Sequence, residues 1–232
     1  MDIKERAPAI DAVLFDLDGT LLDTTEAIIS SLKHTVHEFT GRTPELSELR
    51  PYMGLPLADT FACLTPGRVQ EACDCYVEHN LAVHKDLVRA YPGVNCTIEA
   101  LRRCGIKRGL VTSKRRRTAQ LGLEIAGLAG AFDAMVFYGD TEKSKPDPEP
   151  VMLALKLLGL DTAEGRVIFV GDSPWDVRAA RNASPLGPGL VIMAAAVTYG
   201  ATAAEVLKKE NPDYLLDSIT QILPLCGCPS ET

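Results

Sequence analysis

The sequence contains no apolar run near the roughly 20 residues that cross a bilayer, and no secretory signal is visible in it. It also lacks a long basic stripe, because the net charge is −7 and the basic run at 114–117 is short. Internal repeats and low-complexity tracts are absent as well. We therefore expect a cytoplasmic protein that binds neither a membrane nor nucleic acid, and a monomer and a homodimer both stay open.

The seven cysteines form no zinc pattern, because their two close pairs have C-x-C spacing without matching histidine partners. Without a secretory signal, we expect these thiols to be reduced. Cys226 and Cys228 stand near the C-terminus, where a frayed tail is the expected structure and a redox-active pair is the alternative.

What the sequence does contain is a pair of carboxylates directly after an apolar run. Residues 12–15 are apolar, and Asp16 and Asp18 follow them, with Gly19 permitting a tight turn. The carboxyl ends of strands are where open α/β sheets bind ligands. One carboxylate can attack a phosphoryl group, and a second can protonate the leaving oxygen. We therefore predict that Asp16 is a nucleophile and Asp18 a general acid and base.

Three further polar clusters supply what such a pair needs. Thr112 and Ser113 end an apolar run and could hold phosphate oxygens. Lys145 provides a cation, and Asp172 and Asp176 come after the apolar run 167–170. If the strands are parallel with right-handed crossovers, all these clusters meet at one edge of the sheet.

The predicted convergence of four carboxylates has an electrostatic consequence. Two like charges about 4 Å apart repel by ~4 kcal/mol at an effective dielectric constant near 20. Lys145 neutralises only one charge, so a divalent cation is implied. The motifs contain no histidine or cysteine, and oxygen ligands favour a hard ion such as Mg²⁺.

The chain thus has four motifs: the pair Asp16 and Asp18, then Thr112, Lys145, and the pair Asp172 and Asp176. In residue type and order they resemble the motifs of the haloacid dehalogenase superfamily phosphatases, and the resemblance covers nearly the whole chain. The resemblance implies an aspartyl-phosphate intermediate on Asp16. It also implies a Mg²⁺ ion held by the carboxylates of Asp16 and Asp172 and by the backbone carbonyl of Asp18. Asp176 would ligate the ion or orient its neighbours.

The length of 232 residues allows one sizeable domain plus an insertion. About 65 residues separate the first strand from the helix near 92–93, which is too long for a simple loop. We expect residues 1–22 and 92–232 to form a core and 23–91 a helical cap. The first helix of this cap has apolar residues at 28, 32, 36 and 39, and Asp23 with Thr24 can cap that helix. The two crossings would be hinges whose closure expels water.

Within the cap, residues 23–34, 52–61 and 76–94 resemble the small helical cap of phosphoglycolate phosphatases and the related bacterial cytosolic pyrophosphatases. By this resemblance, Met53 and Gly54 lie on a loop that selects the substrate. His79 and His84 are expected to be packing or surface residues, with substrate contact as the alternative.

The rest of the chain alternates between strand and helix, which predicts an α/β fold with a doubly wound parallel sheet. Expected strands are 109–112, 134–137, 167–170, 190–193 and 214–216, and expected helices are 98–104, 118–126, 147–158, 176–183 and 202–209. Asp217 is expected to cap a last helix. The run 114–117 is interpreted as a solvated helix face, with a phosphate-attracting rim as the alternative. Trp175 is expected to be a wall residue, and the loop 182–189 is longer than in the family.

The sequence thus predicts a Mg²⁺-dependent hydrolase of a small phosphorylated metabolite, such as phosphoglycolate, or of pyrophosphate. Asp16, Asp18, Thr112 and Lys145 would be catalytic, and Ser113 would bind substrate. A phosphosugar mutase with the same core and a non-catalytic phosphate-binding module are the alternatives. Dehalogenation is disfavoured because such relatives lack a carboxylate at the position of Asp18.

Overall fold

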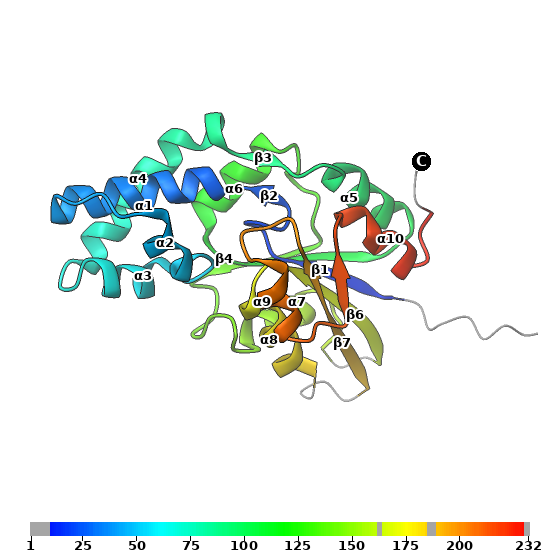
Figure 1. Cartoon of the computed structure of the whole chain (residues 1–232). Helices are drawn as coiled ribbons and strands as arrows, with labels where there is room; N and C mark the ends of the chain where they lie inside the picture. Colours follow the sequence, from blue (N-terminus) through cyan, green and yellow to red (C-terminus); the bar gives the residue numbers. More distant parts are fainter. Residues whose placement is uncertain (1–9, 162–163, 185–188, 230–232) are drawn as a thin grey trace, which may run out of the picture.

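A six-stranded parallel sheet forms the centre of the molecule, with the strand order β5-β4-β1-β6-β7-β8 (Figure 1). The computed structural model describes residues 10–161, 164–184 and 189–229. The strands are β1 (Ala12–Phe15), β4 (Lys107–Arg115), β5 (Ala134–Tyr138), β6 (Gly165–Gly171), β7 (Leu190–Val197) and β8 (Tyr214–Leu216). Because β1 lies between β4 and β6, the residues that follow it are at the middle of the sheet edge.

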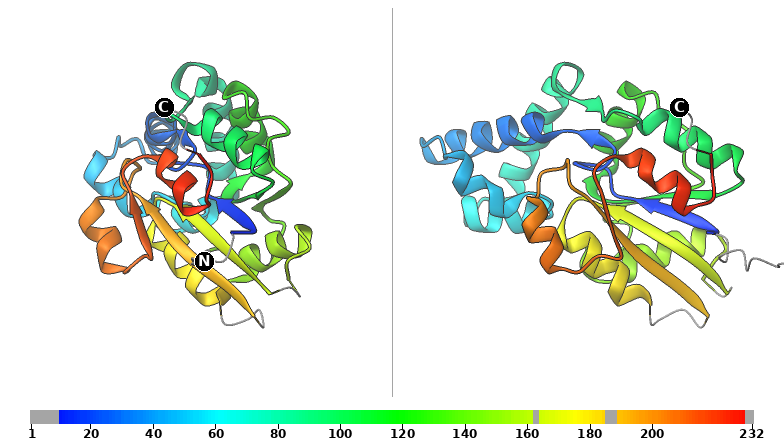
Figure 2. Two further views of the ribbon diagram at one scale, coloured as in Figure 1. Left: turned by 90° about the vertical axis from the view of Figure 1, so that its right-hand side faces the viewer. Right: turned by 45° about the vertical axis from the view of Figure 1, so that its right-hand side comes forward.

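Side-chain alternation along the strands places apolar residues on both faces of the sheet. Val13 and Phe15 belong to one buried cluster, and Ala12 and Leu14 to the other. The first face is covered by α5 (Val94–Arg103), α6 (Arg116–Ile125), η3 (Ile219–Gln221) and α10 (Ile222–Leu225), and the second by α7 (Glu149–Leu157), α8 (Pro174–Ala183) and α9 (Ala204–Lys209). Figure 2 shows these two helical layers on opposite sides of the sheet. The predicted doubly wound α/β fold is confirmed.

A helical insert lies between β1 and β4, beyond one end of the sheet (Figure 1). It contains α1 (Thr25–Thr40), α2 (Leu46–Leu49), η1 (Arg50–Tyr52), α3 (Leu57–Leu64) and α4 (Val69–Leu87). These helices share a small apolar cluster of their own around Leu32 and Phe61. The predicted insertion is therefore present, and the division of the chain into two domains at 22 and 92 stays a prediction.

The two chain segments that connect the insert to the core pair with each other. Strand β2 (Leu22–Asp23) is antiparallel to β3 (Arg89–Ala90), with Leu22 opposite Ala90. Asp23 accepts a hydrogen bond from the backbone N–H of Thr25, the first residue of α1, at 3.2 Å. The predicted capping by Thr24 is wrong, because Thr24 is the N-cap residue but its side chain makes no capping hydrogen bond. A short two-stranded ribbon thus joins the insert to the core, and its action as a hinge stays a prediction.

Some elements differ from their predicted bounds. Helix α3 was not predicted, and β4 continues to Arg115 instead of ending at Thr112. The N-cap of the η3 turn is Ser218 rather than Asp217. Asp217 instead accepts a hydrogen bond from the Thr198 hydroxyl at 2.6 Å. The long loop predicted at 182–189 falls partly, at 185–188, outside the described residues.

Two expectations are wrong for one pair of cysteines: that the thiols are reduced, and that the C-terminal tail is frayed. Cys104 and Cys228 form a disulfide, with their Cα atoms 6.1 Å apart. The pairing arises because α10 packs against α5, which brings the buried Cys228 beside the end of α5. Cys226 stays a free thiol, and burial raises its pKa to about 12. Over the described part of the chain, no helix combines the length and apolar character needed to cross a membrane.

A matched pair of leucines tests the packing of α5 on the sheet. Leu101 is fully buried there, whereas Leu157 on α7 is 56% exposed. Leu101→Ala should lower the free energy of unfolding by about 2–5 kcal/mol, because it removes buried apolar surface and leaves a cavity. Leu157→Ala should change it by less than about 0.5 kcal/mol. Urea denaturation measures both, and similar losses in the two variants would contradict this assignment of the core.

Candidate active site

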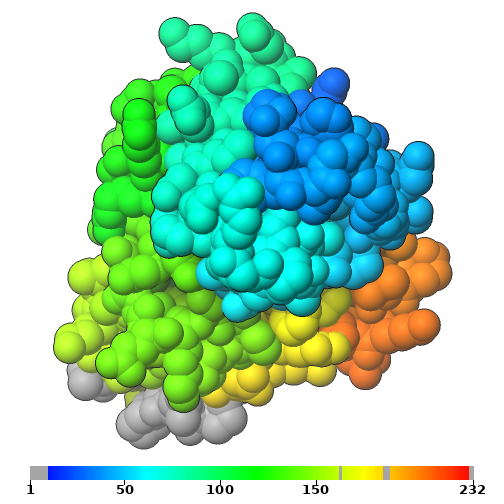
Figure 3. All heavy atoms as spheres, turned by 90° about the vertical axis from the view of Figure 1, so that its left-hand side faces the viewer, coloured from blue at the N-terminus to red at the C-terminus, as the bar shows by residue number. Residues whose placement is uncertain are grey.

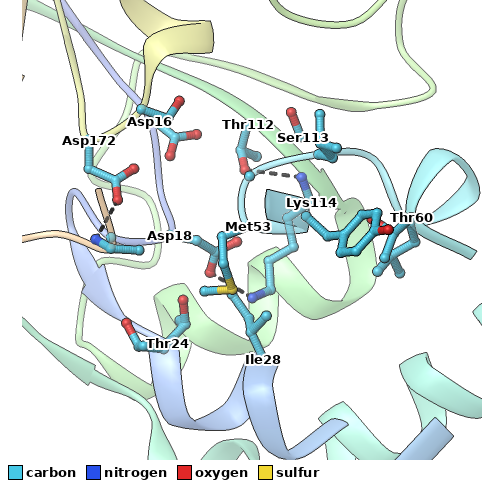
Figure 4. A pocket seen from close by; sticks show the side chains of 18 of the residues that line it. Asp16, Asp18, Thr24, Ile28, Met53, Thr60, Thr112, Ser113, Lys114 and Asp172 are labelled. Atoms are coloured by element: carbon cyan, nitrogen blue, oxygen red, sulfur yellow. Dashed lines mark hydrogen bonds and ion pairs between the residues drawn. The ribbon is translucent and has the colours of Figure 1, made fainter. Parts of the chain in front are cut away.

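Three buried carboxylates meet at the carboxyl edge of the sheet. Asp16 follows β1, Asp172 follows β6, and Asp176 lies in the first turn of α8. One oxygen from each lies within 4.8 Å of the others. The predicted convergence therefore holds for these three acids, and Figure 4 shows Asp16 and Asp172 among the side chains that line a cavity.

The ammonium of Lys145 connects two of these acids. Its Nζ lies 2.7 Å from Asp16 Oδ1 and 2.6 Å from Asp176 Oδ1, and it also donates to the carbonyl oxygen of Val111 at 3.2 Å. Burial disfavours a charged amine, but the two adjacent carboxylates raise the pKa of Lys145 above its ordinary value. The lysine is therefore charged and fixes the orientation of Asp16.

Both oxygens of Asp176 are already engaged. One pairs with Lys145, and the other accepts hydrogen bonds from the Ser173 backbone N–H at 3.0 Å and from the Ser173 hydroxyl at 2.6 Å. This is a capping box at the start of α8. A Cβ on Gly171 would collide with the Asp176 side chain, so a larger residue at 171 does not fit. The contacts favour the orienting role for Asp176 over direct metal ligation.

Asp172 is held from two sides by backbone. One of its oxygens accepts a hydrogen bond from the Ala201 N–H at 2.8 Å, in the loop after β7. Gly19, at φ +81°, and Gly200 approach it so closely that a Cβ on either would collide with the carboxylate group. Sequence reasoning missed the loop after β7, because its contribution is a backbone N–H that leaves no side-chain motif.

The residues at this edge fit a hard divalent cation. Three buried carboxylates face the single ammonium of Lys145, so two negative charges are left without a counter-ion in this group. Burial raises the pKa of Asp16 to about 7 despite the opposing effect of Lys145, and it raises the pKa of Asp172 well above its ordinary value. A dication would remove this excess charge, and oxygen donors suit Mg²⁺-like ions.

Asp18 turns away from this group toward a lysine that the sequence analysis assigned elsewhere. Lys114 Nζ lies 2.7 Å from Asp18 Oδ1, and the two side chains are only 10% and 22% exposed. The interpretation of 114–117 as a solvated helix face is therefore wrong for Lys114. It is on β4, two residues beyond Thr112 at the same strand end, and that position was the available signal.

A local irregularity in β4 explains how Lys114 enters the site. From Val111 to Arg115 the strand advances four residues, while its partner β5 advances only two, from Val136 to Tyr138. Bulges of this kind re-aim side chains and are common beside active sites. Figure 4 shows the Lys114 side chain extending from beside Thr112 toward Asp18, Ile28 and Met53.

The remaining predicted site residues line one cavity between core and insert. Thr112 is buried, and its hydroxyl oxygen accepts a hydrogen bond from the Lys114 N–H at 3.1 Å. Ser113, Met53 and Gly54 also line the cavity, whose volume is about 90 Å³. In Figure 3 the insert, blue to cyan, lies in front of the core and covers this side of it. Lys145 and Asp172, which belong to the core, line the same cavity.

The histidines of the insert and Trp175 are not among the residues that line the cavity. His84 is fully buried, with its Nδ1 2.8 Å from the Asn80 carbonyl oxygen. His79 contacts the Ser31 hydroxyl at 3.1 Å. Trp175 lies beside the loop that carries Met53 and Gly54, where a Cβ on Gly54 would be 3.6 Å from its ring. These contacts support packing roles, as the sequence analysis expected.

A parallel α/β core that gathers acids, a lysine and hydroxyls at its strand ends, beneath a helical insert, is the arrangement of a hydrolase with a doubly wound core. The sequence profile of the haloacid dehalogenase-like hydrolases matches residues 13–184, and the chain belongs to this family.

Known proteins agree with this assignment. Pyrophosphatase PpaX from Bacillus velezensis is 37% identical over 218 residues, covering 94% of this chain and 97% of the relative. The crystal structure of a predicted phosphatase from Clostridium acetobutylicum has a TM-score of 0.78 at 28% identity, covering 93% and 97% of the two chains. That of a predicted phosphoglycolate phosphatase from Haemophilus somnus has a TM-score of 0.80 at 24% identity, with the same coverage. The resemblance found in the sequence, including the subgroup with a helical cap, is confirmed.

Two glycines in the left-handed region provide a test of the acid cluster. Gly19→Ala places a Cβ against Asp172, whereas Gly41→Ala, at φ +70°, has nothing within 4 Å. Both variants should lose about 1 kcal/mol through backbone strain, and Gly19→Ala should lose more, because its Cβ also collides with Asp172. Adding MgCl₂ should raise the melting temperature of the parent and of Gly41→Ala, because a ligand that binds the folded state stabilises it. Gly19→Ala should show little or no such shift, and an undiminished shift would contradict the cation site.

Proposed function

We propose that the protein is a Mg²⁺-dependent phosphatase that hydrolyses a small phosphorylated compound, above all inorganic pyrophosphate, through an aspartyl-phosphate on Asp16. The observation that carries the proposal is the contact of Lys145 with one oxygen of Asp16, at 2.7 Å, at the floor of the cavity. This contact leaves the second oxygen to attack phosphorus. The name of the Bacillus velezensis relative supports pyrophosphate as the substrate.

In the first step, an oxygen of Asp16 forms a bond to phosphorus while the bond from phosphorus to the leaving oxygen breaks. Asp18 donates a proton to that leaving oxygen. In the second step, Asp18 takes a proton from water, and the resulting oxygen attacks the same phosphorus. The bond to Asp16 then breaks, which releases phosphate and restores the carboxylate. Both carboxylates line the cavity.

The other residues of the site bind and orient the reacting groups. Thr112 and Ser113 supply hydroxyl and backbone N–H donors for the oxygens of the transferred group. Asp16, Asp172 and the carbonyl of Asp18 would hold Mg²⁺, which neutralises charge on the phosphoryl group when bound. The insert lines the cavity together with the core, so its closure over a bound substrate would exclude bulk water.

The size of the cavity limits the substrate. Pockets for drug-sized ligands usually measure about 300–1,000 Å³, whereas this cavity measures about 90 Å³. Pyrophosphate and phosphoglycolate are therefore better candidates than nucleotides. A phosphosugar mutase would use the same two aspartates, so analysis of the products separates the two activities.

A phosphate-release screen tests the proposed substrate class. The parent protein with MgCl₂ should release inorganic phosphate from pyrophosphate and phosphoglycolate faster than from hexose phosphates or nucleotides, because the cavity is small. Pyrophosphate should be the fastest, in line with the name of the Bacillus velezensis relative. Chelation by EDTA should abolish the release, and added Mg²⁺ should restore it. Transfer of the phosphoryl group to a sugar without release of phosphate would favour the mutase instead.

Replacing the nucleophile tests the route of the reaction. Asp16→Asn should reduce kcat by about 10³-fold or more, because the amide cannot form the aspartyl-phosphate. Asp86→Asn is the matched control, since Asp86 is exposed on α4 and outside the cavity, and it should keep the parent rate. Phosphate release measures both. An Asp16→Asn variant with parent-like kcat would refute the covalent route.

A further inference from the structure

The described part of the chain contributes three cations to the cavity: Lys114, Arg115 and Lys145. Lys145 is already paired with two carboxylates. The guanidinium of Arg115 points toward α4, where it lies 3.8 Å from Asp74 Oδ1, and its side chain is 33% exposed. Lys114 is different, because its nearly buried ammonium pairs with Asp18 alone. It is therefore the cation best placed to bind an additional anion within the cavity.

The insert contributes no charged side chain to the cavity among the described residues. Its lining residues are polar or apolar and are all uncharged: Thr24, Thr25, Ile28, Leu32, Tyr52, Met53, Gly54, Leu55, Leu57, Thr60, Tyr76 and Asn80. An anionic group that departs toward the insert has to find its counter-ion on the core. Lys114 extends in that direction (Figure 4), whereas Arg115, which also reaches the insert, lies beside Asp74 of α4.

We infer that Lys114 binds the leaving group of the substrate, and that this leaving group is an anion attached directly to the scissile oxygen, as in a phosphoanhydride. The inference deepens the proposed function and rests on it. The substrate class is thus pyrophosphate-like, and phosphate esters of neutral alcohols are poor substrates.

The position of Lys114 relative to Asp18 supports this role. Asp18 protonates the leaving oxygen in the proposed reaction, so that oxygen lies within hydrogen-bond distance of its carboxylate. Lys114 Nζ is 2.7 Å from the same carboxylate, which places the ammonium one hydrogen bond away from the leaving group. An ammonium has three donors, so Lys114 can keep Asp18 and also bind an oxygen of the departing phosphate.

Two residues in the wall of the cavity carry a buried polar atom without a hydrogen-bond partner. Thr24 Oγ1 and Asn80 Oδ1 are buried without a hydrogen-bond partner, and both residues line the cavity. Asn80 is fixed by its amide nitrogen, which donates to the Ala27 carbonyl at 3.3 Å and to the Ser31 hydroxyl at 3.2 Å. Buried polar atoms cost free energy when unpaired. The Thr24 hydroxyl can donate to a phosphate oxygen, and Asn80 Oδ1 can accept from a protonated one.

Two anhydride substrates of similar size test this role, because both are reactive but they differ in the charge of the group beside the scissile oxygen. Pyrophosphate leaves as phosphate, whereas acetyl phosphate presents an uncharged acetyl group beside the scissile oxygen. Lys114→Met should lower kcat/KM for pyrophosphate by about 100-fold, mainly through KM, as expected for a lost charge-assisted contact. For acetyl phosphate the loss should stay within about 5-fold. Lys114→Arg should recover most of the pyrophosphate activity, because the charge is restored.

The control is Arg117→Met, which removes one positive charge from an exposed position on α6 outside the cavity and should leave both substrates unchanged. Equal losses on both substrates in Lys114→Met would overturn the inference, since they would show that Lys114 acts through Asp18 alone. Unchanged activity on pyrophosphate would overturn it as well. If the parent protein hydrolyses acetyl phosphate but not pyrophosphate, this inference is wrong, although the protein is still a phosphatase. If the parent protein is inactive on every phosphate compound, the proposed function itself is wrong.

Discussion

The mutual repulsion of buried carboxylates is the constraint on which the rest of the structure depends. Asp16, Asp172 and Asp176 are held within 4.8 Å of one another, and only Lys145 opposes their charge inside this group. Such a group is unstable without further positive charge. A bound dication would neutralise the excess negative charge, and it would then attract an anionic substrate that the carboxylates alone repel.

The central features of the fold could be predicted because they follow from local sequence. An apolar strand followed by Asp16, and another followed by Asp172, indicated a parallel sheet with its site at the carboxyl edge. The interaction of Asp172 with the backbone of Ala201 could not be predicted, since any residue except proline offers an N–H. The Cys104–Cys228 disulfide was also missed, because it depends on tertiary packing between α5 and α10.

Lys114 shows where a pattern can mislead. Four consecutive basic residues are typical of a solvated surface, and the three after Lys114 are exposed or half-buried. The irregular pairing of β4 with β5 separates Lys114 from that run and directs it into the cavity. In the described residues, the charged side chains that line the cavity come from the core, and those of the insert are neutral. Under the proposed function, the insert would therefore limit the size of the substrate and the core would bind its charge.

The most direct test of the account is to trap the reaction on the enzyme. The parent protein is mixed with ³²P-labelled pyrophosphate and MgCl₂, quenched in acid within a single turnover, and digested for peptide mapping. We expect acid-stable label on the peptide that contains Asp16, and its loss after treatment with hydroxylamine, which cleaves acyl phosphates. Phosphate release at the full rate with no labelled peptide, or with the label on another residue, would contradict it.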